Sequence, residues 1–179
     1  MFLKYRSVAF NFQSLNKINK SYFSISISSK NDSNGYIEIR DTDKNGLIRR
    51  IVMVNDKQRN CLSLNAIKHL QNAIKNTDVN KYRIIILSAG KRNVFSSGHN
   101  LKELSSENMA EQVFKEMSNL CEMLRKSPLP TIAEVYGLAA AGGCQLAASC
   151  DILVASDKAT FSTPGVKFGI FCSTPGMTD

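Results

Sequence analysis

The chain has 179 residues and a formal net charge of +8, and 43% of its residues are hydrophobic. This length suits one domain of ordinary size, and the apolar content is enough for a packed core, which excludes a chain that is disordered throughout. No run of eighteen apolar residues occurs, so the sequence predicts no membrane span.

The positive charge is concentrated at the N-terminus. The first 31 residues hold five basic residues and no acidic one, which leaves 18 basic and 15 acidic residues in the rest of the chain. The segment 1–30 is also rich in Ser, Asn and aromatic residues, and it lacks the unbroken apolar core of a secretory signal. This composition is typical of a mitochondrial transit peptide, and the alternative is an ordinary disordered basic tail. We expect residues 1–30 to be a transit peptide with a soft boundary, and residues 31–179 to form the domain.

The domain is expected to begin with a β-hairpin and a helix. Two segments rich in β-branched residues, 35–41 and 47–55, flank an Asn-Gly dipeptide, which is the pattern of two antiparallel strands. After a polar loop, Ser63 is placed to cap a helix. Apolar residues then recur at three- and four-residue spacing, which predicts one buried helix face. The residues of this face are Ile67, Leu70 and Ile74.

Strands then alternate with helices along the chain. The first of these strands is a nearly continuous apolar run, the pattern of a strand buried on both faces. The first helix carries an apolar stripe and ends before Pro128 and Pro130. Such alternation implies βαβ crossovers and a parallel sheet, which places the chain in the α/β class. The predicted elements are a strand over 82–89, a helix over 108–126, a strand over 131–137, a helix over 142–150 and a strand over 151–156.

The residue types that bind metals or act as nucleophiles form no known motif. The five cysteines form no CxxC, and the two histidines form no HExxH, so no metal site is predicted. A P-loop and a GxSxG elbow are both absent. The odd number of cysteines and their apolar neighbours predict reduced, mostly buried thiols, as in a mitochondrial matrix or a cytosol.

Two glycine-containing loops remain as candidates for a site. They read FSSGHNL at 95–101 and GLAAAGGCQLA at 137–147, and each follows a predicted strand. Ligands bind at the carboxyl ends of parallel strands in open α/β sheets, and the start of a helix presents unpaired N–H groups. Two such loops side by side can direct two backbone N–H groups at one oxygen, as an oxyanion hole does. The alternative is close helix–strand packing, which also selects Gly and Ala.

The two loops also carry a family resemblance. VFSSGHNLKEL at 94–104 and YGLAAAGGCQLAASCDILVAS at 136–156 resemble the enoyl-CoA hydratase/isomerase (crotonase) superfamily. The resemblance implies a crotonase (ClpP-like) fold of repeated ββα units in a spiral, assembled as a homotrimer or a dimer of trimers. It implies an acyl-CoA thioester as the ligand and no separate cofactor, because coenzyme A is part of the substrate.

The resemblance also implies roles for residues of both loops. By motif position, the backbone N–H groups of Ser97 and Gly142 would form the oxyanion hole for the thioester oxygen. The turn that contains Ser97, Gly98, His99 and Asn100 would meet the adenine and pantetheine of coenzyme A through its main chain.

Three charged residues outside the loops have less specific roles. Lys57 and Arg59 fall near the positions where the family places basic residues for the coenzyme A phosphates, and the alternative is solvated surface charge. Glu134 is an unusual charge in a strand of the buried type. It either reaches the pocket or points to a polar edge.

Two departures from the family pattern bear on activity. Hydratases of the family carry two catalytic glutamates, and the matching positions here are Gln145 and Gly165. Neither residue transfers protons, and a positioned acid or base is typically worth ~10²–10⁴-fold in rate. The resemblance therefore implies a hydratase-like protein (lyase class) that is weak or inactive, and whether it is an enzyme stays open. The alternatives are a non-catalytic acyl-CoA sensor or pseudoenzyme subunit, and, with less support, RNA binding.

The family pattern normally continues beyond the point that corresponds to Asp179. The missing part consists of helices that cover the active site and help to build the trimer. We therefore expect residues 31–179 to be the N-terminal portion of an enoyl-CoA hydratase/isomerase domain that lacks the C-terminal helical part. We expect it to leave apolar surface uncovered and to serve fatty acid metabolism in the mitochondrial matrix.

Overall fold

The computed structural model describes residues 28–31, 35–41 and 45–168. Most of the predicted transit peptide lies outside these residues. Its last residues, 28–30, belong to the first strand of the structure, which pairs with the next strand in antiparallel fashion. The second TPG sequence and Cys172 also lie outside the described residues.

The strands of the described residues form two sheets. The larger sheet has six strands, and the smaller sheet has three parallel strands. In spatial order the larger sheet contains β1 (Ser28–Asn31), β2 (Ile37–Asp41), β3 (Ile48–Met53), β4 (Ile84–Ser88), β6 (Thr131–Val135) and β8 (Ile152–Ala155). The smaller sheet contains β5 (Val94–Ser96), β7 (Leu138–Ala140) and β9 (Thr160–Ser162).

The strand order explains the spiral. The predicted β2–β3 pair is antiparallel as expected, and β3, β4, β6 and β8 then run parallel. Each turn of the chain adds one strand to the larger sheet and the next strand to the smaller one, as β4–β5, β6–β7 and β8–β9 do. A helical segment follows each pair, so the unit that repeats is ββα. The smaller sheet was not predicted from the pattern of residues, because each of its strands has three residues.

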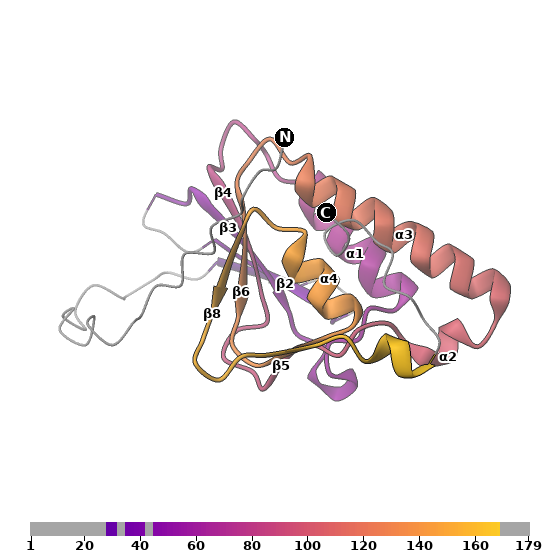
Figure 1. Cartoon of the computed structure of the whole chain (residues 1–179). Helices are drawn as coiled ribbons and strands as arrows, with labels where there is room; N and C mark the ends of the chain where they lie inside the picture. The colour runs from indigo at the N-terminus through magenta and orange to yellow at the C-terminus, as the bar shows by residue number, and fades with distance from the viewer. Residues whose placement is uncertain (1–27, 32–34, 42–44, 169–179) are drawn as a thin grey trace, which may run out of the picture.

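The helices cover one face of the larger sheet, as Figure 1 shows for α1, α3 and α4. Three of the described helical segments, η3, α2 and η4, were not among the predicted elements. The helical segments are η3 (Asp56–Gln58), α1 (Leu64–Lys75), α2 (Leu101–Leu104), α3 (Glu107–Arg125), α4 (Gly142–Ala148) and η4 (Pro164–Phe168).

The core lies between the larger sheet and these helices. Ser63 caps α1 as predicted, because its Oγ accepts a hydrogen bond from the Ala66 N–H at 3.2 Å. The predicted apolar faces of α1 and α3 are buried. On the covered face of the sheet, neighbouring strands place buried side chains in register, such as Ile51 and Leu87. The opposite face is more open: Ile84 and Ile86 are half-buried there, so the prediction that this strand is buried on both faces was wrong.

The last strand of each sheet exposes large apolar side chains. Ile152 and Val154 in β8 and Phe161 in β9 are 50%, 41% and 48% exposed. Among the described residues, no strand pairs with the outer edge of β8 or β9. This agrees with the expected uncovered apolar surface. No helix in the described part of the chain has the length and apolar content to cross a membrane.

The cysteines of the described residues are free, as predicted. Cys121 and Cys144 are buried, whereas Cys61 and Cys150 are half-buried. Burial raises the pKa of Cys150 to about 12, and it also raises the pKa of Cys121 and of Cys61 above the ordinary value. The thiolate is the reactive form of cysteine, so these thiols are expected to react slowly in the folded chain.

We expect iodoacetamide at pH 8 to label Cys61 before Cys121, Cys144 and Cys150. Cys121, Cys144 and Cys150 lie in or beside the core, and the raised pKa of Cys121 and of Cys150 leaves these two with little thiolate at that pH. Peptide mapping by mass spectrometry after timed labelling measures the order, and labelling in urea is the control in which all five should react alike. Early labelling of Cys121 or Cys150 would contradict their burial.

Candidate functional site

The two glycine-containing loops lie against each other. A Cβ added to Gly98 would come within 2.9 Å of the Ala140 oxygen and 3.1 Å of the Gly142 nitrogen. A Cβ added to Gly143 would come within 2.6 Å of the Ser96 oxygen. Real Cβ atoms do not approach backbone so closely, so glycine is required where the loops meet. The predicted juxtaposition of the two loops is present.

A third segment, residues 59–62, runs beside the first loop. The Leu62 N–H donates to the Gly98 oxygen at 2.8 Å, and the Asn60 side-chain amide donates to the Val94 oxygen at 3.2 Å. Arg59 and Asn60 both have positive φ, at 52° and 49°. Sequence reasoning missed this segment as a support of the site. The available signal was the asparagine, which tolerates this backbone conformation better than most residues.

The Ser97 amide is already engaged. Its N–H donates to the Arg59 oxygen at 3.1 Å, and the N–H of the next residue, Gly98, donates to the Ser96 Oγ at 3.2 Å. The structure therefore does not leave Ser97 free for the oxyanion-hole role that its motif position implied. The physical reason is the Arg59 carbonyl, which the positive φ of residues 59 and 60 brings to this loop.

Two other backbone N–H groups at this place have no hydrogen-bond partner in the part of the chain that the structure describes. Gly142 is the first residue of α4, and a helix offers no acceptor to its first N–H groups. His99 forms a parallel bridge with Leu62, and in such a bridge the hydrogen bonds run through the residues on either side of His99. The His99 N–H therefore points away from Leu62. Within the described part of the chain, neither N–H has a hydrogen-bond partner.

The residue before Gly142 holds a strained conformation. Ala141 has φ 46° and ψ −117°, which alanine rarely adopts, and its N–H donates to the Ser162 oxygen at 2.8 Å. Strain of this kind is typically worth ~1–3 kcal/mol and is concentrated at functional sites. Here it sets the direction in which α4 begins, and with it the direction of the Gly142 N–H.

The His99 side chain lies inside the same contact. A Cβ on Gly142 would be 3.0 Å from the His99 Nε2, so the imidazole rests directly on Gly142. The ring meets the Phe114 ring edge-on, with centroids 5.3 Å apart and planes at 85°. Burial lowers the pKa of His99 below its ordinary value, and the Leu62 backbone opposes this in part. From the sequence, we expected His99 to contact a ligand only through its main chain, so the place of its imidazole was not predicted.

The other predicted turn residue, Asn100, has a structural task. Its side-chain oxygen accepts a hydrogen bond from the Lys102 N–H at 3.1 Å and so caps α2. Its main chain lies beside the site. Lys57 and Arg59 are both exposed, and neither forms an ion pair with a described residue. They are therefore available to an anion from solvent.

The two positions that correspond to the family's glutamates are both buried. Gln145 lies in the first turn of α4 and is 4% exposed. Its side-chain amide makes no hydrogen bond within the described residues. Gly165 lies in η4, which follows β9. Neither residue offers a group that titrates, so this site can bind and polarise a carbonyl oxygen without an acid or base at these two positions.

Glu134 is held away from the site. Its carboxylate pairs with the Arg50 guanidinium, and it accepts a hydrogen bond from the Ser88 Oγ at 2.7 Å. Its neighbours in β6, Ala133 and Val135, point into the core between the sheet and the helices, so Glu134 points to the opposite face. Glu134 therefore does not reach the pocket, and it lies on the open face of an inner strand and not at the polar edge that was its other expected place.

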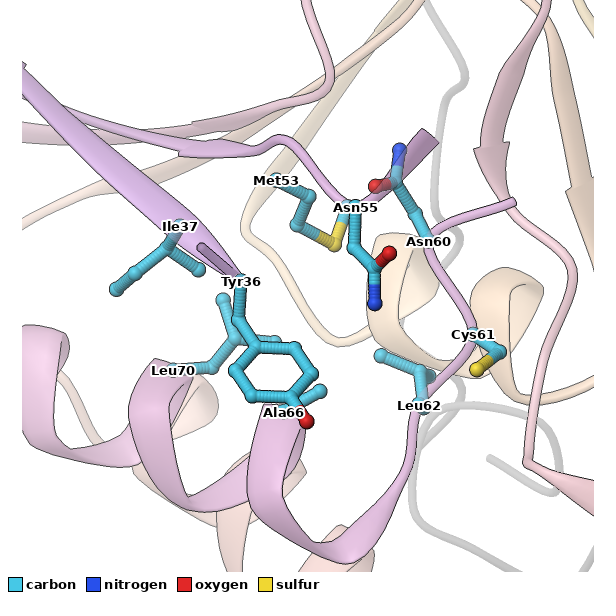
Figure 2. Close-up of a pocket in the computed structure, with 9 residues that line it drawn as sticks. All are labelled: Tyr36, Ile37, Met53, Asn55, Asn60, Cys61, Leu62, Ala66 and Leu70. Atoms are coloured by element: carbon cyan, nitrogen blue, oxygen red, sulfur yellow. The ribbon is translucent and has the colours of Figure 1, made fainter. Parts of the chain in front are cut away.

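A small cavity lies between the 55–62 loop, α1 and the ends of β2 and β3, and Figure 2 shows the residues around it. Its volume is about 10 Å³, which is room for one water molecule at most. The Asn60 Oδ1 is buried without a hydrogen-bond partner and is the natural partner for such a water. The cavity is far too small for an acyl-CoA. It lies behind the loop that carries Lys57 and Arg59.

No group of three His, Cys, Asp or Glu residues in the described ranges is arranged to hold a metal ion. The chemistry that the site offers is therefore that of backbone N–H groups, one imidazole and nearby basic side chains. Backbone N–H groups of this kind can stabilise an anionic or polarised oxygen.

Comparison with known proteins agrees with this arrangement. The profile of the family described as enoyl-CoA hydratase/isomerase matches residues 43–178. The chain is 54% identical to the enoyl-CoA hydratase domain-containing protein 3, mitochondrial, of Xenopus laevis and also to that of Homo sapiens, over 134 residues in each case. These alignments cover 73% of this chain and 45% and 44% of the two relatives. The chain thus spans about half the length of the curated relatives that it matches.

Solved structures give the same result. The crystal structure of human enoyl Coenzyme A hydratase domain-containing protein 3 superimposes with a TM-score of 0.72 at 50% identity. The match covers 78% of this chain and 55% of that one. The predicted crotonase fold is confirmed for the described part of the chain, including the ββα spiral that the family resemblance implied. By sequence and by structure, this chain belongs to the enoyl-CoA hydratase/isomerase family.

Proposed function

We propose that the chain binds acyl-CoA thioesters where the 95–101 and 137–147 loops meet, and that it is weak or inactive as a hydratase. The thioester oxygen would accept hydrogen bonds from the N–H groups of Gly142 and His99. The observation that carries the proposal is that neither N–H has a partner among the described residues. The two residues are also in contact, since a Cβ added to Gly142 would lie 3.0 Å from the His99 Nε2.

The surroundings of this contact suit the rest of the ligand. The turn from Ser97 to Asn100 presents main chain to the adenine and pantetheine, and Ser97 belongs to this turn although its N–H is engaged. The exposed Lys57 and Arg59 lie on the adjoining loop, within reach of phosphates. Arg59 is tied to the turn through its own carbonyl. Coenzyme A enters as part of the substrate, so the proposal needs no separate cofactor.

Unfolding of the 179-residue chain in urea tests the proposal. A ligand that binds only the folded state stabilises it, by about 2.7 kcal/mol when its concentration is 100 times the Kd. We expect butanoyl-CoA to raise the urea midpoint and free coenzyme A to raise it less, because free coenzyme A has no thioester oxygen. Circular dichroism measures the midpoint. Equal midpoints with and without butanoyl-CoA would contradict the proposal.

Restoring both glutamates should raise hydratase activity. In the Gln145→Glu, Gly165→Glu double variant, we expect the hydration of a short 2-enoyl-CoA to increase by ~10²-fold or more, because each positioned acid or base typically contributes ~10²–10⁴-fold. Loss of the enoyl-thioester absorbance measures the rate. The control is Gln145→Met with Gly165→Ala, which alters the same positions without adding a titrating group. No gain over this control would mean that the pocket lacks the rest of the hydratase geometry.

A non-catalytic role is the alternative function. The observation in its favour is that Gln145 is buried at a position where the family's hydratases have glutamate. A sensor or pseudoenzyme subunit would bind acyl-CoA in the urea experiment and leave the enoyl-CoA unchanged. Assembly as a homotrimer or a dimer of trimers belongs to the same proposal, and light scattering of the purified chain measures it.

We also propose a mitochondrial matrix location and a role in fatty acid metabolism. The relatives of Xenopus laevis and Homo sapiens are named mitochondrial, and residues 1–30 have the composition of a transit peptide. Deleting residues 1–30 should leave a fluorescent fusion of the chain in the cytosol, because the basic segment would be the import signal. The control replaces Asp56 with Asn, an exposed change that leaves the segment intact. Import of the shortened chain would contradict the transit peptide.

A further inference from the structure

The proposed binding role uses the main chain of His99 but not its side chain, which belongs to a half-buried residue. Its main chain supplies an N–H, but its imidazole has two further nitrogens. Both are buried, and within the described residues neither makes a hydrogen bond of normal geometry, although the Leu62 backbone lies close enough to act on the pKa of the ring. An unsatisfied buried polar group destabilises a folded chain, and such groups in native proteins are few and call for a reason. The stability of the fold therefore does not explain why residue 99 is a histidine.

The position of the ring supplies a reason. It rests on Gly142, whose added Cβ would be 3.0 Å from the His99 Nε2. It is held from the other side by the edge-on contact with Phe114 of α3. The two residues of this contact, Gly142 and His99, each carry a backbone N–H that has no partner among the described residues. A carbonyl oxygen bound by these two groups would therefore lie beside the imidazole.

We propose that the His99 imidazole is the proton-transfer group of this site. This rests on the proposed acyl-CoA binding and adds a reaction to it. The imidazole would take a proton from the carbon next to the thioester carbonyl. The C–H bond breaks, an N–H bond forms on the imidazole, and the electron pair moves to the thioester oxygen, which becomes an enolate held by the two backbone N–H groups. Return of the proton from the same nitrogen restores the thioester, so the step needs no other reactant.

The charged groups around His99 are consistent with a neutral imidazole. Burial lowers its pKa, and the only group that opposes this is the Leu62 backbone, with no contribution from a charged side chain. Glu103, from the adjoining α2, is engaged with the Leu64 N–H at 2.8 Å. A neutral imidazole can accept a proton at physiological pH, which Gln145 and Gly165 cannot do at any pH near neutrality.

The test is the exchange of the α-protons of butanoyl-CoA for deuterium in D₂O, followed by NMR with the 179-residue chain. We expect the chain to catalyse the exchange and His99→Gln to slow it by about 100-fold or more. The matched control is His69→Gln. His69 is the other histidine of the chain and stacks on Tyr36 with centroids 5.3 Å apart, so its replacement should leave the exchange rate unchanged.

The pH dependence of the exchange gives a second readout. The neutral imidazole is the base, so the rate should be full above the pKa of His99 and fall as the pH drops through it. Because that pKa is lowered, the fall should occur below the ordinary range of histidine. A purely structural role for His99 would produce no such profile. If the role of His99 were purely structural, His99→Gln would lower the urea midpoint. We expect the midpoint to be unchanged or higher, because the variant removes a ring whose nitrogens are unsatisfied.

The outcomes separate this inference from the binding proposal. If butanoyl-CoA stabilises the chain but no exchange occurs, the proton-transfer role is overturned and the binding proposal stands. If His99→Gln exchanges as fast as the unaltered chain, the role is likewise overturned. If butanoyl-CoA does not stabilise the chain at all, both proposals fail together.

Discussion

Replacing Gly137 with alanine should lower the free energy of unfolding by about 3 kcal/mol, the largest loss that we expect from one added methyl group. A Cβ at this position would lie 2.2 Å from the Asn93 oxygen and 2.3 Å from the Asn93 carbonyl carbon. These are backbone atoms, so no side-chain rotation relieves the contact. The Leu138 N–H also donates to the Asn93 oxygen at 2.9 Å, which holds the two segments at this distance. Urea unfolding followed by circular dichroism measures the loss.

Gly137→Ala should also weaken ligand binding where the two loops meet. Gly137 lies between β6 and β7, where the chain passes from the larger sheet to the smaller one. Asn93 precedes β5, which carries the chain into the 95–101 loop. Pushing these segments apart would move the two loops relative to each other. We therefore expect the variant to lose the stabilisation by butanoyl-CoA in addition to its own stability.

Gly35→Ala is the matched control for this variant. Gly35 has φ +69° and no atom within 4 Å of an added Cβ, so the change tests backbone strain without a clash. We expect a loss of about 1–2 kcal/mol, which is the usual penalty for a left-handed L-residue. Equal losses in Gly35→Ala and Gly137→Ala would show that the contact with Asn93 is not the cause.

Much of the larger sheet and of the helix layer could be predicted from the sequence. Ser63 and the spacing of the apolar residues after it located α1, because capping and periodicity are local properties. The same holds for α3, whose predicted stripe of Val113, Met117, Leu120 and Leu124 is buried. The runs that became β4 and β6 were recognisable because they are apolar and are bounded by polar or turn-forming residues.

The smaller sheet could not be predicted from the residues in the same way. A strand of three residues, such as Leu138–Ala140, is too short to show a two-residue alternation. Its residues are small, and small residues are also expected in a ligand-binding loop, so the pattern had two interpretations. Only the family resemblance, with its repeated ββα units, implied these strands.

The site was predicted in part. The meeting of the two loops followed from their place after parallel strands, and glycine was informative because the approach leaves no room for a Cβ. The state of the Ser97 N–H was not predictable, because it depends on the Arg59 carbonyl, which lies far away in sequence. The burial of the His99 ring depends in the same way on Phe114 of α3. Such contacts arise from tertiary packing, which no local pattern records.

Gly142→Pro should remove the preference for butanoyl-CoA over free coenzyme A, and it should slow α-proton exchange by ~10²–10³-fold, the usual effect of losing one oxyanion-hole donor. Proline has no N–H, so the thioester oxygen would lose one of its two partners. The helix itself can accept the change, because Gly142 is the first residue of α4 and proline is tolerated at the first position of a helix. The added ring would also press on the His99 imidazole, which the alanine variant controls for. Urea midpoints with the two ligands and NMR of the exchange measure the two effects.

Gly142→Ala separates the N–H from the space around it. Alanine and proline both add a Cβ, which would lie 3.0 Å from the His99 Nε2, but only alanine keeps the N–H. If alanine retains the preference for the thioester and proline loses it, the backbone N–H is the group that recognises the thioester oxygen. If both variants lose the preference alike, the displaced imidazole is the cause, and the Gly142 N–H is not the oxyanion donor. If neither variant loses the preference, the thioester oxygen does not bind at the Gly142 N–H, because proline has removed that donor.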